Sequence, residues 1–161
     1  MTDLTYLATA EGFLYLAALK NLYHGEIVGH ALGAHTTKTL VTQALEQAIR
    51  HHKPPRGLIH HSDRGSRYCA HKHQQPLRTN RLKASMNRKG DCYDNAPIES
   101  FWGVLKTEWV YHRRYPTRAQ AIEEITHYIE IFYNRQRRQA QLGFLSPAAY
   151  RERYWQQQQA A

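Results

Sequence analysis

The first third of the chain shows the short hydrophobic period of β-strands. Residues 2–8 alternate between apolar and polar side chains and contain β-branched and aromatic residues, so they predict a strand. Two further strands are expected over residues 14–22 and 26–32, joined in a hairpin at His24-Gly25. These three segments predict the beginning of a sheet.

The period then lengthens to that of a helix. Apolar residues recur at helical spacing from Thr36-Thr37 to about His51, and Pro54-Pro55 ends the pattern. Residues 58–60 form a short fourth strand, and Asp63 falls just past its end. Three strands, a helix and a fourth strand predict an α/β layer with one crossover connection, in which functional groups belong at strand ends.

A second helical region is expected after residue 94. Residues 64–82 read as helical or irregular, Lys83–Met86 as an edge strand, and residues 87–91 as a polar, basic loop. Asp94 or Asn95 is expected to cap the helix that follows, because a short acceptor side chain there satisfies a free backbone N–H. Pro97 suits its first turn. The apolar stripe of this helix consists of Ile98, Trp102 and Leu105.

Two more helices complete the predicted chain. Thr117 and Gln120 form a capping-box pattern before a helix that runs through Tyr133, and Ser146-Pro147 opens a last helix to about Tyr154. We expect one domain, with a core over residues 1–112, a helical extension over 113–155 and a disordered tail over 156–161. The length of 161 residues suits a single domain with a sizeable core.

Charge narrows the range of partners. The formal net charge is +9 and the pI is about 9.7, which indicates nucleic acid or another polyanion, with an ordinary basic surface as the alternative. Residues 1–55 are neutral overall, so the whole excess lies in residues 56–161. Two cysteines make no disulfide framework, and there is no signal peptide or apolar run of membrane-spanning length, so a cytoplasmic location is expected.

Three acids stand at informative places. Between Asp3 and Asp63 lie 59 residues, and between Asp63 and Glu99 lie 35. Each acid alone has an ordinary explanation, as an N-terminal, turn or first-turn helical residue. Clustered carboxylates repel each other unless a cation lies between them, and ligands that are all oxygen favour Mg²⁺ or Mn²⁺. The helix carrying Glu99 places Gly103 and Lys106 on nearly the same face.

The strings around these acids resemble those of the DDE transposases and retroviral-type integrases, and bacterial insertion-sequence transposases above all. They occur in family order over almost the whole chain: Asp3-Leu-Thr-Tyr, His61-Ser-Asp-Arg-Gly-Ser, Ser85-Met-Asn-Arg-Lys-Gly-Asp-Cys-Tyr-Asp-Asn-Ala, Glu99-Ser-Phe-Trp with Leu105-Lys-Thr-Glu, and Tyr133-Asn-Arg-Gln-Arg-Arg with Leu142-Gly-Phe-Leu-Ser-Pro. The resemblance implies a ribonuclease-H-like α/β fold with a mixed five-stranded sheet flanked by helices, and extra C-terminal helices.

The resemblance also implies the chemistry. Asp3, Asp63 and Glu99 would be catalytic residues that bind two Mg²⁺ or Mn²⁺ ions, for DNA cleavage and strand transfer in transposition. DNA itself, a homo-oligomer on DNA and an N-terminal helix-turn-helix portion from another chain are the expected partners. Candidate DNA contacts are Lys106, Arg88, Lys89, Asn95, Arg135, Arg137 and Arg138.

This sequence departs from the family pattern in ways that leave other functions open. Asn21, Arg67 and Gln139 replace the usual Asp, Gln and His, and only Met1 and Thr2 precede Asp3. We therefore expect the C-terminal catalytic portion of a transposase, with weak and non-specific DNA binding. The alternatives are a catalytically dead, truncated remnant that only binds DNA, and a nuclease acting on RNA–DNA hybrids.

Overall fold

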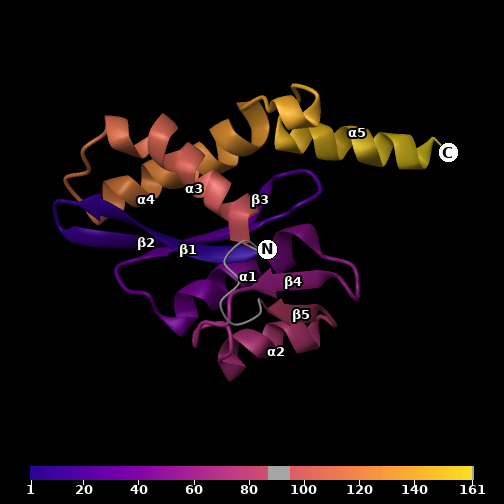
Figure 1. Cartoon of the computed structure of the whole chain (residues 1–161), viewed down its shortest axis with the longest axis horizontal. Coiled ribbons are helices and arrows are strands. Elements are labelled where there is room, and N and C mark those ends of the chain that lie inside the picture. Colours follow the sequence, from indigo (N-terminus) through magenta and orange to yellow (C-terminus); the bar gives the residue numbers. More distant parts are fainter. Residues whose placement is uncertain (87–94, 161) are drawn as a thin grey trace.

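Five strands form the centre of the molecule. The computed structural model describes residues 1–86 and 95–160. Strands β1 (Thr2–Thr9), β2 (Gly12–Lys20) and β3 (Ile27–Gly33) make an antiparallel sheet, and β4 (Ile59–Ser62) pairs with β5 (Lys83–Met86) in parallel. Strand β1 packs beside β4, although no backbone ladder joins them within the described residues, so the strands follow the spatial order 3-2-1-4-5 (Figure 1). The predicted mixed α/β fold is confirmed.

Helices cover both faces of these strands. Helices α1 (Lys38–His52) and α2 (His71–Thr79) lie on one side, and α3 (Ala96–Glu108), α4 (Arg118–His127) and α5 (Pro147–Gln159) lie on the other (Figure 1). Short 3₁₀ turns at Val110–His112 and Ala140–Leu142 connect the second group. Within the described residues, no helix is long and apolar enough to cross a membrane.

The central strand β2 explains why there are two cores. Its residues alternate between the faces, with Leu16 and Ala18 packing among the α3 side chains and Ala17 and Leu19 among those of α1. All four are at most 5% exposed. Because both faces of β2 are buried, the strand carries an almost continuous apolar run.

Most of the helix starts follow the predicted capping chemistry. Thr37, Thr117 and Ser146 each accept a hydrogen bond from the backbone N–H three residues ahead. Asn95, one of the two caps expected for α3, does not, and its backbone is helical (φ −97°, ψ −2°) rather than extended. Asp94, Arg88, Lys89 and the rest of the predicted loop lie outside the described residues.

Three other details differ from the sequence predictions. The helix expected to continue through Tyr133 changes at Tyr128 into a π-helix that ends at Gln136. The hairpin turn is wider than predicted, since β2 ends at Lys20 and β3 begins at Ile27, and within it the Asn21 side chain accepts a hydrogen bond from the backbone N–H of Tyr23 at 2.8 Å. Residues 156–159 are helical rather than frayed, in keeping with the good helix propensity of glutamine.

Candidate active site

Asp3 lies near the start of β1 and is held by a side chain of α3. The indole N–H of Trp102 donates a hydrogen bond to Asp3 Oδ2 at 2.9 Å. Burial raises the pKa of Asp3, the bond from Trp102 opposes that rise, and the negative charges of Asp63 and Glu99 add to it. Asp3 is therefore near enough to Asp63 and Glu99 to be affected by their charges.

Asp63 directly follows β4, at its carboxyl end. The backbone N–H of Gly65 donates a hydrogen bond to Asp63 Oδ1 at 2.7 Å. A Cβ atom at position 65 would lie 2.8 Å from the same oxygen, so only glycine fits without moving the carboxylate. The Asp-Arg-Gly sequence therefore fixes one oxygen of Asp63 and leaves the other unbonded within the described residues.

Glu99 extends from the first turn of α3 into solvent. Its neighbour Ile98 is completely buried, which orients this turn. The buried Lys20 side chain, at the end of β2, donates from Nζ to the backbone oxygen of Pro97 at 2.9 Å. Burial, and then the charge of Arg137, lowers the pKa of Lys20. Lys20 therefore links the central strand to the turn that carries Glu99.

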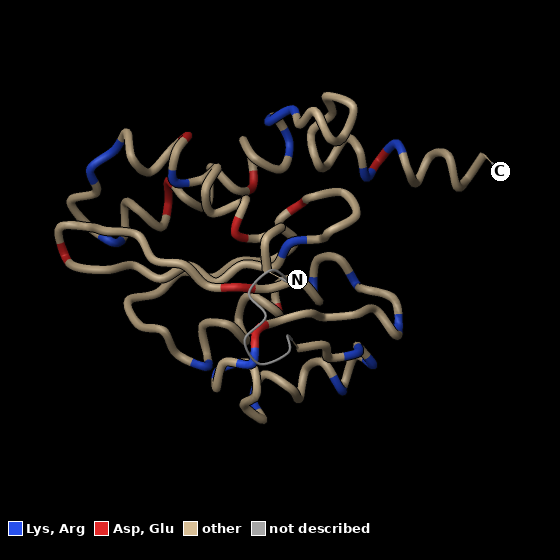
Figure 2. Tube along the Cα trace, in the orientation of Figure 1, with Lys and Arg blue, Asp and Glu red and all other residues tan. Residues whose placement is uncertain are grey.

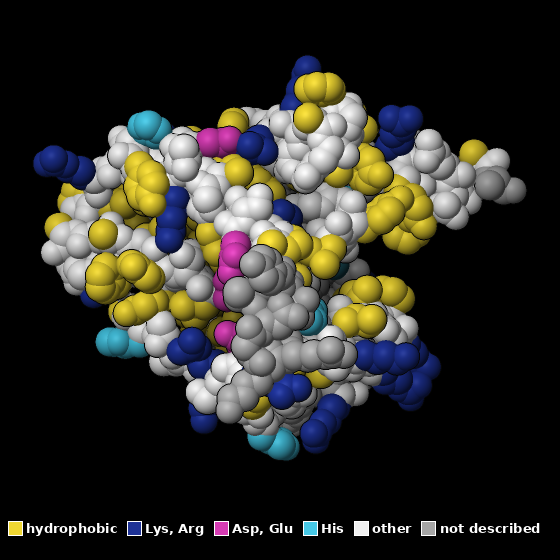
Figure 3. Space-filling model, viewed as in Figure 1, with side chains coloured by type: hydrophobic (Ala, Val, Ile, Leu, Met, Phe, Trp, Pro, Cys, Tyr) yellow, Lys and Arg dark blue, Asp and Glu magenta, His cyan; other side chains and the backbone are white. Residues whose placement is uncertain are grey.

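The three acids come from elements that meet at one place on the surface. Figure 2 shows acidic positions where β1, the end of β4 and the start of α3 converge, and Figure 3 shows acidic side chains gathered at the middle of that face. Within the described residues, no three acidic, histidine or cysteine side chains are already close enough together to hold a metal ion. The structure thus places the predicted triad on one face, with its carboxylates farther apart than shared coordination of one ion requires.

A buried polar chain lies behind the acids. Tyr68 is 1% exposed, and its hydroxyl has no hydrogen-bond partner within the described residues. Burial raises the pKa of Tyr68, and so do the charges of Asp3 and Asp63. Tyr68 packs edge-to-face on His73, whose Nε2 lies 3.3 Å from His60 Nε2. His60 and His73 are therefore joined by a hydrogen bond inside the protein.

The five predicted DNA contacts that the structure describes lie on or beside α3 and around the end of the π-helix, whereas Arg88 and Lys89 lie outside the described residues. Lys106 Nζ lies 5.3 Å from the centre of the Tyr6 ring on β1. Arg137 forms a two-pronged ion pair with Glu108, with hydrogen bonds of 2.6–3.0 Å, so its guanidinium is already engaged. Arg135 and Arg138 are exposed. The positions of these side chains do not test whether they contact DNA, so the DNA-binding assignments stay predictions.

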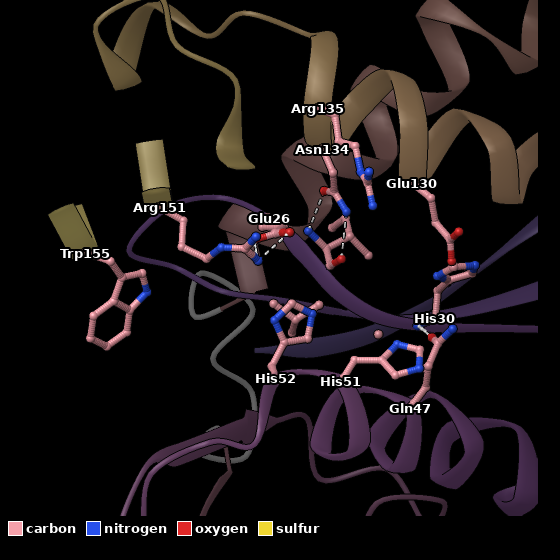
Figure 4. A pocket seen from close by; sticks show the side chains of 13 residues that line it. Glu26, His30, Gln47, His51, His52, Glu130, Asn134, Arg135, Arg151 and Trp155 are labelled. Atoms are coloured by element: carbon pink, nitrogen blue, oxygen red, sulfur yellow. Dashed lines mark hydrogen bonds and ion pairs between the residues drawn. The ribbon is translucent and has the colours of Figure 1, made fainter. Parts of the chain in front are cut away.

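A hollow of about 600 Å³ lies away from the acids, between β3, the end of α1 and the C-terminal helices (Figure 4). Its buried Glu26 receives two hydrogen bonds from Arg151 Nη1, at 2.7 and 2.9 Å. Asn134 bonds to both the N–H and the C=O of Ile27, each at 2.9 Å, in the manner of a neighbouring strand. These contacts attach the helical layer to β3 and protect that sheet edge.

The groups that orient the acids could not be recognised from the sequence as site residues. Trp102 lies on an apolar stripe, which suggested an ordinary core residue. Lys20 lies at the end of an apolar strand, which suggested an ordinary solvated lysine. The signal for Gly65 was available in the Asp63-Arg-Gly65 string, where glycine permits the close approach. No local pattern identifies the partner of Trp102, because Asp3 is 99 residues away.

The strand order and the two helical layers define a ribonuclease-H-like α/β domain. Residues 1–92 match a family model described as an integrase core domain, and residues 99–154 match a second model with the same description. The chain belongs to the integrase core domain family.

Curated relatives extend the likeness to insertion sequences. The chain is 57% identical, over 97% of its length, to the "Insertion element IS600 uncharacterized 31 kDa protein" of Shigella sonnei, and covers 57% of that protein. It is 40% identical, over 92% of its length, to "Transposase InsF for insertion sequence IS3A" of Escherichia coli (strain K12), and covers 51% of it. The chain thus spans about half the length of these relatives.

Solved structures agree on the fold. The catalytic core domain of HTLV-2 integrase in complex with magnesium (trimeric form) matches with a TM-score of 0.70 at 14% identity, covering 92% of each chain. The catalytic domain of Mos1 transposase, determined with Raltegravir and Mg, matches with a TM-score of 0.62 at 13% identity, covering 81% of this chain and 69% of that one. At such identities these likenesses establish the fold alone.

Proposed function

We propose that this chain is the catalytic core of an insertion-sequence transposase, which cleaves and joins DNA strands with a divalent cation. The observation that carries the proposal is the convergence of Asp3, Asp63 and Glu99 from β1, β4 and α3 on one face. The insertion-sequence names of the relatives support it. The net charge of +9 suits a DNA substrate.

The donor set fits Mg²⁺ or Mn²⁺. The three side chains offer only oxygen ligands, and Trp102 and Gly65 hold one oxygen each of Asp3 and Asp63. The other oxygen of each side chain accepts no side-chain hydrogen bond from the described residues and can bind a cation, and Glu99 completes the set. Two structural neighbours are described with magnesium, which supports a divalent cation, and we propose that two ions bind. Bound there, they would lower the pKa of an attacking hydroxyl and stabilise the leaving oxygen.

The residues of this chain then have separate roles in phosphoryl transfer. A water or a DNA 3′-hydroxyl forms the new P–O bond while the bond to the leaving 3′-oxygen breaks, and the attacking hydroxyl loses its proton. Asp3 and Asp63 orient the reacting groups through the carboxylate oxygens that they present. Lys20 and the buried Ile98 position Glu99.

Assembly on DNA is also part of the proposal. The HTLV-2 integrase core is described in dimeric and trimeric forms, and a simian T-cell lymphotropic virus integrase is described in an intasome. We infer that this chain acts as a homo-oligomer, with recognition of the element's ends supplied by a helix-turn-helix portion.

The test is the reversal of strand transfer on a preformed branched DNA with Mn²⁺, a substrate that does not require recognition of transposon ends. The native chain should resolve the branch, and Glu99→Gln, confirmed as folded by circular dichroism, should not. A native chain that is folded but inactive would favour the alternative, a transposase remnant that only binds DNA. Equal activity in both proteins would refute the assignment of Glu99.

A further inference from the structure

One part of the chain is almost free of acidic residues. Between Glu46 and Asp91 the single acidic residue is Asp63, whereas the same stretch contains half of the chain's 22 lysines and arginines. The stretch includes the end of α1, strands β4 and β5, and helix α2. Positive charge is therefore concentrated on the side of the fold opposite the C-terminal helices.

Backbone hydrogen bonds gather four of these cations at one end of the β4–β5 pair. The Gly57 N–H donates to the Arg81 carbonyl at 2.8 Å, and the Lys83 N–H donates to the Leu58 carbonyl at 2.9 Å. These bonds join the loop before β4 to the turn before β5. We call the exposed side chains of this junction the β4–β5 basic patch, which consists of Lys53, Arg56, Arg81 and Lys83.

Two of the four patch residues lie at sharp turns of the backbone. Lys53 and Arg81 have positive φ values of 42° and 56°, in the left-handed region that non-glycine residues seldom adopt. Lys53 ends α1 there, and Arg81 occupies the tight turn after α2. Figure 3 shows Lys and Arg side chains gathered on this part of the surface.

The patch differs from the cations of the helical layer in its lack of partners. Arg113, Arg137 and Arg151 are paired with Glu124, Glu108 and Glu26 respectively. Within the described residues, none of the four patch side chains forms an ion pair with an acid. Unpaired cations held together on one surface attract a polyanion, and the long arms of lysine and arginine suit phosphate contacts.

We propose that the β4–β5 basic patch binds the phosphate backbone of duplex DNA beyond the reacting strand. The inference rests on the proposed function. Strand β4 leads from the patch to Asp63, and four strand residues span roughly 13 Å. A duplex carries a negative charge about every 1.7 Å along its axis, so DNA at the acids has phosphates within reach of the patch. Phosphate contacts of this kind position DNA without reading its sequence.

The experiment compares two double variants of equal charge in the full chain. Arg56→Gln with Lys83→Gln neutralises half of the patch, and Arg114→Gln with Arg153→Gln neutralises two exposed cations of the helical side. Affinity for a long duplex is measured by fluorescence anisotropy over a range of salt concentrations. The patch variant should lose roughly 1.8 from the slope of log K against log salt, and the control less than half of that.

A second readout separates this proposal from the catalytic one. On a short branched DNA at saturating concentration, the patch variant should resolve the branch at the native rate. Equal salt slopes for the patch variant and the native chain would overturn the proposal that the patch binds DNA. A loss of slope in the control variant as large as that in the patch variant would also overturn it. A native chain that cannot resolve the branch, combined with a reduced slope in the patch variant, would refute the catalytic proposal and leave the patch standing.

Discussion

Replacing Trp102 with phenylalanine tests whether the indole N–H prepares the active site. The substitution removes the 2.9 Å donor to Asp3 Oδ2 and keeps an aromatic ring in a position that is 6% exposed. A hydrogen bond to a charged group contributes about 1.5–3 kcal/mol. At about 1.4 kcal/mol per tenfold change, its loss should lower the rate of branch resolution by about 10- to 150-fold.

Trp109 provides the matched control for that change. It follows α3 directly, and its indole N–H is buried without a hydrogen-bond partner within the described residues. Trp109→Phe therefore loses a similar ring volume and no bond to a carboxylate. Its rate should stay within a few-fold of the native chain, so the difference between the variants isolates the hydrogen bond.

Two measurements establish where the effect arises. The apparent affinity for Mn²⁺, followed by electron paramagnetic resonance, should fall in Trp102→Phe because Asp3 is no longer oriented. The free energy of unfolding, measured with urea in the absence of metal, reports the loss of packing for both variants. Equal rates and equal Mn²⁺ affinities in the two variants would refute the positioning role.

Three further changes test other parts of the site. The pKa of Asp3 is raised in the folded state, so the ionised carboxylate destabilises the fold. Asp3→Asn should therefore have a higher free energy of unfolding in urea than the native chain at neutral pH without metal. This gain in stability should vanish as pH falls through the raised pKa. Gly65→Ala should displace the Asp63 carboxylate and abolish branch resolution, while duplex affinity in an anisotropy assay stays near native. Arg137→Gln should lower the free energy of unfolding by about 0.5–1 kcal/mol, discounted because both partners are partly exposed. The pKa of Glu108 is lowered chiefly by its bond from Arg137, so this last difference should be present above the ordinary carboxyl pKa and disappear as pH falls through the lowered one.

Local patterns predicted the elements well where a single face or cap decides the structure. The strand over residues 2–8, the helix that begins at Thr36-Thr37 and the cap at Thr117 depend on residues that are near in sequence, and they were predicted correctly. The π-helix after Tyr128 and the missing cap at Asn95 were not predicted. Both depend on backbone conformations that composition and spacing do not specify.

The acids of the site could be predicted because they lie within recognisable sequence motifs, but the side chains that surround them in the fold could not. Trp102 suggested a core residue from its spacing, and it is indeed buried, yet its N–H meets Asp3 only after β1 and α3 pack together. The pairing of Arg137 with Glu108 likewise joins residues 29 positions apart. Such contacts arise from tertiary packing and leave no periodic trace in the sequence.

The distribution of ion pairs gives the two sides of the fold different responses to salt. The helical layer is attached partly through pairs such as Glu26 with Arg151, in which the carboxylate side chain is only 8% exposed and therefore weakly screened. The β4–β5 basic patch is exposed and unpaired within the described residues, so its attraction for phosphate should be strongly screened. Moderate salt should therefore release DNA from the patch while the fold stays intact, because the patch residues are not members of these ion pairs.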